Sequence, residues 1–366
     1  MPIGESSETA LLHGEVVFLY AFDVANEIRL NRVAELFAGQ SVPFVAHRDS
    51  PAPRNVPVSK PLSLEVPLDV RYQAAPVGIL IRIYEVGVIS IILRVAFHCN
   101  TLAELSPFHT PRLDDGRPFD QVARDECNRV YQQLHDALLA PGLPTDPEAY
   151  TVFCFTQLGA ERDANRWLAQ HEREVAGLLT QTPAERLSVA QVAEVLRLRR
   201  SFENTDVVVI DWDAALLIDL VSAAHDVLFV LELANLQLEE FRWMDRTLDH
   251  YLERAYDDVG RHRWWFGTAT GILGTLRRLR VDFARLADEV THITKFVGDW
   301  HLARIYLMAR ERFHLDQWRA SVDLRLAELD RLYTMAQGDL YDQRMLWLEA
   351  IIVLLFAVDL IILFFK

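Results

Sequence analysis

Residues 346–365 read LWLEAIIVLLFAVDLIILFF. Thirteen of the sixteen residues in 350–365 are Ile, Leu, Val or Phe. Twenty helical residues rise about 30 Å, which is roughly the hydrocarbon thickness of a bilayer. The apolar side chains favour insertion by about 0.3 to 0.6 kcal/mol each, and together they outweigh the roughly 2.5 to 3.5 kcal/mol cost of a central Asp359. The stretch therefore predicts a helix that crosses a membrane once.

Only Lys366 follows this segment, so the sequence predicts that residues 1–345 lie on one face of the membrane. Such a chain is a tail-anchored, single-pass protein whose first partner is the lipid bilayer, through residues 346–365. The alternative is a core helix of a soluble protein. It is disfavoured because apolar core helices are usually shorter than a membrane span.

Charged residues interrupt the apolar run in a recognisable pattern. Residues 348–352 read LEAII, Asp359 lies ten residues after Glu349, and Arg344 lies five residues before Glu349. This pattern resembles the C-terminal signature of the DUF155 (RMND1-like) family, which typically has Trp in place of Ala350. The resemblance covers roughly the last seventy residues. It implies an integral membrane protein that self-associates and organises a process at the membrane, and it implies no catalytic residues.

Glu349 and Asp359 are the most informative polar residues of the segment. Ten positions at 100° each place them about 80° apart on a helix, so both can face one neighbouring helix. Acids within a membrane segment usually face protein or water. We therefore expect a homo-oligomer contact, with Arg344 of a neighbouring chain as the partner of Glu349. Two alternatives remain open: Glu349 in the headgroup layer with Asp359 protonated, or an ion or proton path through Asp359.

The composition sets further bounds on function. The chain has 366 residues, 51% hydrophobic and 24% charged, which is a globular balance long enough for two domains. Its net charge of −15 argues against direct nucleic-acid binding, which draws affinity from basic residues. Lysine occurs only at Lys60, Lys295 and Lys366, so no polybasic segment accompanies the apolar run. An additional, unknown protein partner is expected for a scaffold.

Three widely spaced cysteines suggest neither a disulfide framework nor a CxxC metal site. The N-terminus MPIGESSETALLHGE lacks an apolar core and has no arginine, so it reads as neither a secretory signal nor a mitochondrial transit peptide. We therefore expect a bacterial inner-membrane member of the family, with the N-terminal bulk in the cytoplasm.

Apolar patterning predicts an α+β N-terminal domain. Residues 64–72 alternate strictly, which is typical of a half-buried strand, and residues 79–85 and 88–97 form a hairpin around Val86-Gly87. The order of elements indicates a ferredoxin-like α/β sandwich with an extra strand. The expected strands are 15–22, 64–72, 79–85, 88–97, 150–155 and 206–212, and the expected helices are 24–37, 119–139, 161–179 and 188–199, the last with Ser188 as its N-cap.

The second half of the chain predicts a long, coiled-coil-like helical hairpin. A helical tract runs from Ala214 to about Val259, and a second tract begins near Thr268. Apolar residues at alternating spacings of four and three predict that this second helix packs on another. They are Leu279, Phe283, Leu286, Val290, Ile293, Val297 and Trp300, with a weaker ladder at Val322, Leu326, Leu329, Tyr333, Ala336 and Leu340. Residues 311–317 break the spacing and predict an elbow.

These patterns divide the chain into five parts. We expect a flexible N-terminus at 1–14, the sandwich at 15–157, a helical connection with a closing strand at 158–213, the hairpin at 214–345 and the anchor at 346–366. The last helix is expected to run into the anchor, with Gly338 as its one soft point.

The sequence offers little support for catalysis or a cofactor. Asp245, Asp249 and Glu253 share a helix face beside His250, but no Glu-x-x-His pairing accompanies them, so a solvated acidic face is favoured over a metal site. The scattered histidines form no zinc signature, and no P-loop or dinucleotide fingerprint occurs. We expect a scaffold or tether without catalytic residues, metal or cofactor. The alternative is an enzyme with a pocket near Asp211, Asp213 or Cys154.

Overall fold

A computed structural model describes residues 11–42, 61–67, 69–142, 146–219, 221–260, 281 and 300–364. The chain forms two compact units. The first unit contains Met1–Phe241 and Leu286–Asp316, and the second contains Arg242–Arg285 and Gln317–Lys366.

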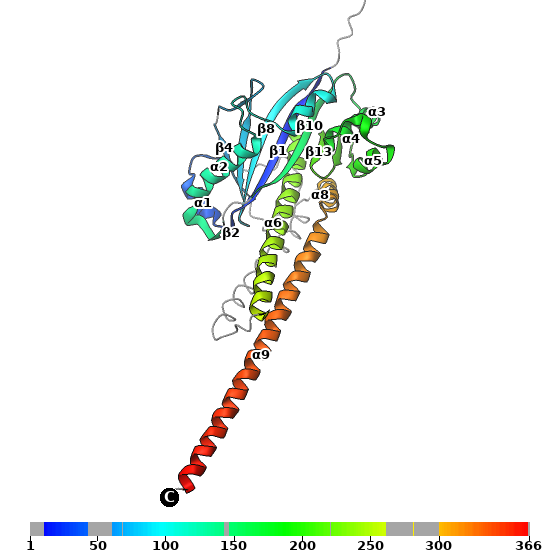
Figure 1. Cartoon of the computed structure of the whole chain (residues 1–366). Helices are drawn as coiled ribbons and strands as arrows, with labels where there is room; N and C mark the ends of the chain where they lie inside the picture. Colours follow the sequence, from blue (N-terminus) through cyan, green and yellow to red (C-terminus); the bar gives the residue numbers. More distant parts are fainter. Residues whose placement is uncertain are drawn as a thin grey trace, which may run out of the picture. The chain divides into compact units, whose positions relative to one another are not determined.

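The first unit is built on a mixed sheet, in which β1 (Leu12–Asp23) is central (Figure 1). Strand β1 pairs antiparallel with β8 (Val88–Cys99) on one side and with β10 (Glu148–Leu158) on the other. Strand β13 (Ala214–Ile218) pairs parallel with β10, which makes the sheet mixed. In the part of the chain that is described, nine strands form the sheet in the order β11-β12-β13-β10-β1-β8-β7-β4-β3. The remaining strands are β3 (Ser41–Val42), β4 (Leu62–Val66), β7 (Gly78–Ile83), β11 (Arg199–Arg200) and β12 (Val207–Ile210).

The two faces of the sheet differ in chemistry because successive side chains of a strand point to opposite faces. On β8, Ile89, Ile91 and Leu93 join the main hydrophobic core, whereas Ser90 and Arg94 alternate with them. The core face is covered by η1 (Leu102–His109), α2 (Phe119–Gln133), α3 (Ala164–Gln170), α4 (Glu172–Leu179) and α5 (Val189–Val195).

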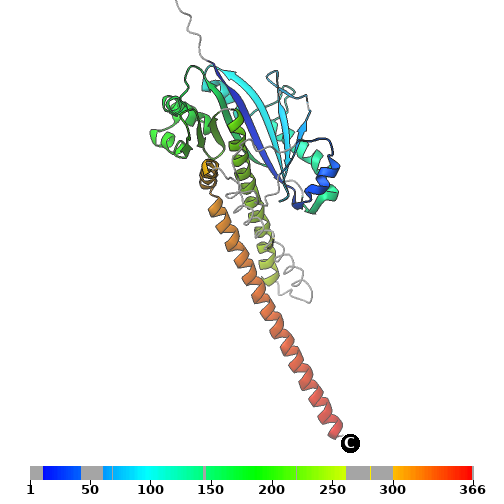
Figure 2. The ribbon, with the colours of Figure 1, turned by 180° about the vertical axis from the view of Figure 1, so that it is seen from behind.

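The opposite face of the sheet carries the first part of α6 (Val221–Gly260), as the view from behind shows (Figure 2). Two polar contacts join α6 to the sheet. Glu232 of α6 pairs with Arg82 of β7, and the Asn235 side chain donates to the Glu148 carbonyl oxygen at 3.1 Å. The shorter elements of the unit are β2 (Ala25–Ile28), α1 (Leu30–Leu36), β5 (Arg71–Tyr72), β6 (Ala75–Pro76), η2 (His135–Ala137), β9 (Leu138–Pro141), η3 (Ala184–Arg186) and α8 (Trp300–Arg312).

The mixed α/β class expected from the sequence is confirmed, as is the hairpin of β7 and β8. Gly87 makes that hairpin possible, because its φ is +97° and a Cβ there would lie 1.6 Å from the Ala25 carbonyl oxygen. The ferredoxin-like arrangement is not confirmed. The four strands β10-β1-β8-β7 are antiparallel neighbours, and further strands flank them on both sides of the sheet, whereas the expectation included one extra strand.

Two expected helices begin later than the sequence patterns indicate. Residues expected to open the helix at 24–37 form β2 instead, because they pair antiparallel with β9, and this tertiary pairing overrides local propensity. The helix expected from Ala214 begins at Val221, because Ala214–Ile218 is strand β13. A fully buried apolar strand has no alternation to distinguish it from a helix.

The elbow expected at 311–317 is present in the structure. Helix α8 ends at Arg312, His314 has a φ of +52°, and α9 (Leu315–Phe364) begins one residue later. Phe313 is fully buried and its ring lies 5.0 Å from that of Tyr150, edge to face. Packing of this ring against the sheet therefore fixes the point where the two helices separate.

The second unit is a helical hairpin made by the end of α6 and by α9. Val322, Leu326 and Leu329 of α9 are buried, as are Leu248 and Leu252 of α6, which gives each helix an apolar stripe. Helix α9 is 50 residues long and continues without a break through Gly338. The side chains of Tyr333, Ala336 and Leu340, which were expected to extend the stripe, lie outside the described part.

Candidate functional sites

The C-terminal part of α9, in the second unit, exposes many large apolar side chains. Among the residues that the structure describes, one helix is long and apolar enough to cross a membrane, by length and composition, and its span is Met345–Ile362. The mean hydropathy of this span is 2.5, and none of it is buried. Trp347 is 71% exposed and Phe356 is 69% exposed. The span coincides closely with the one that the sequence predicts, and residues 365 and 366 lie outside the described part.

The two acids of this span occupy the same exposed helix. Glu349 and Asp359 are both exposed, with large apolar side chains such as Ile351, Leu355 and Ile362 around them. Arg344 lies one residue before the span on the same helix, and its side chain lies outside the described part. The contact expected between Arg344 and Glu349 of two chains therefore stays a prediction.

Of the seven residues expected to form the helix-packing ladder, the structure describes one, Trp300. Trp300 opens α8 and is 56% exposed. Its ring lies 5.7 Å from that of Phe202, and the Arg304 guanidinium lies over it at 4.3 Å. Leu279, Phe283, Leu286, Val290, Ile293 and Val297 lie outside the described residues.

The acidic face of α6 pairs with an arginine of α9. Arg325 lies 3.2 Å from Asp245 and also forms an ion pair with Asp249, and Ser321 donates to Asp245 at 3.3 Å. The second helix therefore supplies a cation instead of a further metal ligand. Across the described residues, no group of three or more His, Cys, Asp and Glu side chains is arranged to hold a metal ion.

The region proposed for an enzyme pocket contains a buried ion pair. Arg312 is 5% exposed, and its Nη1 lies 3.4 Å from Asp211 Oδ1. The same guanidinium donates to the carbonyl oxygens of Ile210 and Glu194 at 3.2 and 3.0 Å. Burial raises the pKa of Asp211, and the charge of Arg312 opposes that rise. The arrangement ties α8 to β12 and α5, which is a structural role.

Cys154 and Asp213 do not add reactive groups to this region. The Cys154 thiol is 3% exposed on β10, and burial raises its pKa well above the ordinary value, so the thiol stays protonated at neutral pH. The main-chain carbonyl oxygen of Asp213 accepts from Thr151 N at 3.1 Å, which joins the start of β13 to β10.

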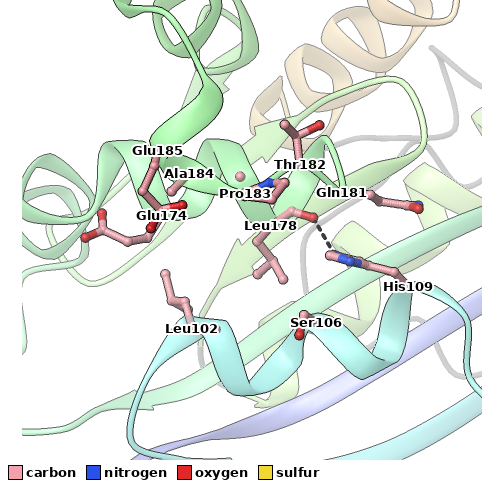
Figure 3. A pocket seen from close by; sticks show the side chains of 12 residues that line it. Leu102, Ser106, His109, Glu174, Leu178, Gln181, Thr182, Pro183, Ala184 and Glu185 are labelled. Carbon is pink, nitrogen blue, oxygen red and sulfur yellow. Dashed lines mark hydrogen bonds between the residues drawn. The ribbon is translucent and has the colours of Figure 1, made fainter.

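A cavity of about 390 Å³ lies elsewhere in the first unit, between η1 and the segment from α4 to η3 (Figure 3). His109 forms part of its wall and donates from Nε2 to the Leu178 carbonyl oxygen at 2.9 Å. Burial lowers the pKa of His109, so its ring is neutral at pH 7. The cavity is lined by Leu102, Ala103, Ser106, His109, Glu174, Gly177, Leu178, Gln181, Thr182, Pro183, Ala184 and Glu185. Patterns in the sequence do not predict this cavity, because its two walls are about seventy residues apart in the chain.

Fold and surface together define a mixed α/β sheet domain followed by long helices, the last of which ends in an apolar span. A family model described as "Uncharacterized protein MJ0711, N-terminal domain" matches residues 13–224, more than half of the chain. The chain therefore belongs to this family. The matched region begins in β1 and ends in the first turn of α6, so it contains the sheet.

A relative from Methanocaldococcus jannaschii, named "Uncharacterized protein MJ0711", is 21% identical over 218 residues. The alignment covers 59% of this chain and 65% of the length of that relative. No solved structure matched the chain. The resemblance to DUF155 lies in the last seventy residues, outside the matched region, and is not confirmed by these comparisons.

Proposed function

We propose that this protein is held in a membrane by residues 345–362 and works there as a homo-oligomeric scaffold or tether, with its sheet domain on the cytoplasmic side. The observation that carries the proposal is an 18-residue apolar stretch of helix in which no residue is buried. Soluble proteins rarely expose contiguous apolar patches larger than a few hundred Å². A bilayer is the solvent that such a surface suits.

The homo-oligomeric part of the proposal rests on the two acids of the span. Charged side chains within a bilayer are costly unless they face protein or water, so Glu349 and Asp359 favour a contact with another membrane helix. Arg344 of a second chain is the partner proposed for Glu349. The resemblance of this segment to the DUF155 (RMND1-like) family, with its self-associating membrane proteins, supports the same reading.

Membrane insertion is tested by extraction of membranes with alkaline carbonate. The unaltered chain is expected to stay in the pellet, whereas Ile352→Arg/Leu355→Arg is expected to lose stable insertion, because two arginines near the span centre cost about 5–7 kcal/mol. Leu324→Arg is the matched control: Leu324 is 70% exposed on α9 outside the span, so this variant should stay in the pellet. Release of the unaltered chain by carbonate would reject the anchor.

Self-association is tested by light scattering on detergent-solubilised protein. We expect a mass above that of one 42.0 kDa chain, and a smaller mass for Glu349→Ala and for a chain ending at Gln337. A monomeric unaltered chain would reject the oligomer. An oligomer that survives both changes would assign self-association to the first unit or to the hairpin instead of the two acids.

The cavity beside His109 is the observation that favours the second candidate, a membrane-attached enzyme. Its one histidine is held by a carbonyl oxygen, and its other polar walls are hydroxyl, amide and carboxylate side chains. Nothing in this set forms a nucleophile and base pair, so the scaffold remains the leading proposal.

A further inference from the structure

Two histidines from separate parts of the chain converge at one end of the sheet. His13 lies on β1 and His98 on β8, and their Nδ1 atoms are 2.6 Å apart. The ring planes are inclined by 68°, so the two rings meet through their nitrogens and do not stack. His98 is exposed and His13 is partly buried, so solvent reaches the pair.

The pairing of β1 with β8 brings these two rings together. His13 and His98 are direct partners in the antiparallel ladder, and side chains of opposed residues lie on the same face of a sheet. The register of β1 against β10 shifts between His13 and Gly14, where Thr156 of β10 is the extra residue, and the Thr156 hydroxyl donates to the His13 carbonyl oxygen at 3.3 Å. Gly14 is required there, because a Cβ would lie 1.9 Å from the Cys154 carbonyl oxygen. The main chain of His13 is therefore held between β8 and β10.

The nearest acid along β1 is already engaged. Glu15 accepts from Arg94 Nε at 3.0 Å and forms an ion pair with the same guanidinium, whose Nη1 lies 3.4 Å from His225 Nε2. Glu15 is therefore not free to complete a three-residue metal site. A metal ion bound by the two histidines would therefore complete its coordination with water.

We propose that His13 and His98 form a two-histidine binding site for a divalent transition-metal ion of the zinc type. Imidazole nitrogen is a preferred donor for such ions. With Zn–N distances of about 2.0–2.1 Å and tetrahedral angles, two ligating nitrogens lie about 3.3 Å apart, so a small rotation of either ring opens the pair enough. The metal takes the Nδ1 lone pairs, and each neutral ring keeps its proton on Nε2. Two open positions are left for water or for an oxygen donor of a partner.

Titration calorimetry of the full chain in detergent with ZnCl2 tests this site. We expect one zinc ion per chain to be lost, or bound roughly tenfold or more weakly, in both His13→Gln and His98→Gln. His135→Gln is the matched control, because His135 is exposed on η2 and away from both strands, and its zinc binding should equal that of the unaltered chain. Zinc binding that neither strand substitution changes, or no binding at all, would overturn the proposal.

A second measurement does not depend on the variants folding. Cu²⁺ added at one equivalent to the unaltered chain should give an electron paramagnetic resonance spectrum with nitrogen splitting from two imidazoles. A spectrum without nitrogen splitting would overturn the site, as would one that His98→Gln leaves unchanged while its circular dichroism shows native folding.

Discussion

Replacing Glu232 by Ala is expected to lower the free energy of unfolding by about 3–5 kcal/mol, because it leaves Arg82, whose side chain is 14% exposed, without its carboxylate. Glu232 is 2% exposed, its Oε1 accepts from Tyr84 Oη at 2.9 Å, and its Oε2 pairs with Arg82. Burial raises the pKa of Tyr84, so the tyrosine is a neutral donor at all ordinary pH values. Thermal unfolding of the purified chain should show a midpoint lower by roughly 10 °C.

Two control variants distinguish the loss of this ion pair from a general effect of changing α6. Glu253→Ala removes an exposed acid of the same helix and should change the free energy of unfolding by less than about 0.5 kcal/mol. Arg82→Met/Glu232→Leu replaces both charges by apolar groups and should regain most of the loss. Equal stability of Glu232→Ala and the unaltered chain would show that α6 does not depend on this contact.

Replacing Arg312 by Ala is the second change with a large expected effect, again about 3–5 kcal/mol of unfolding free energy. The substitution removes the donor to the Ile210 and Glu194 carbonyl oxygens and the cation beside Asp211. Without that cation, burial should raise the pKa of Asp211 further above its unfolded value. The proton that Asp211 then takes up stabilises the folded form at low pH, so the deficit of the variant should shrink as the pH falls.

Chemical denaturation at pH 7 and pH 5 measures this deficit. Arg310→Ala serves as the control, because Arg310 lies two residues earlier and pairs with Asp316 at the surface, where an ion pair contributes about 0–1 kcal/mol. Arg312→Ala/Asp211→Asn should be more stable than Arg312→Ala at pH 7. A deficit that is the same at both pH values would show that Asp211 does not carry the effect.

Patterns within one element were sufficient to predict much of this fold. The apolar run of β1, the Gly87 turn and the apolar span of α9 depend on neighbours in sequence. Ser188 was expected to cap a helix, and its Oγ accepts from Gln191 N at 3.1 Å. Strand β13 was not predicted, because an unbroken apolar run is compatible with both the helical period of about 3.6 residues and the strand period of two.

Ion pairs between residues that are far apart in the chain could not be predicted in the same way. Arg82 and Glu232 are 150 residues apart, and Arg312 and Glu194 are 118 apart. Their pairing depends on strand order and helix placement, which periodicity does not determine. His13 and His98 become visible as partners only when the register of β1 against β8 is known.

Because α9 is continuous, the rotation about the helix axis between its hairpin stripe and its apolar span is fixed. Because each residue turns the helix by about 100° and advances it by about 1.5 Å, the orientation of Glu349 and Asp359 is set by the stripe at Val322, Leu326 and Leu329. One residue inserted between the halves would swing both acids through more than a quarter turn, whereas seven inserted residues would nearly restore their direction. The number of residues between the hairpin stripe and the span therefore determines the direction in which the two acids point.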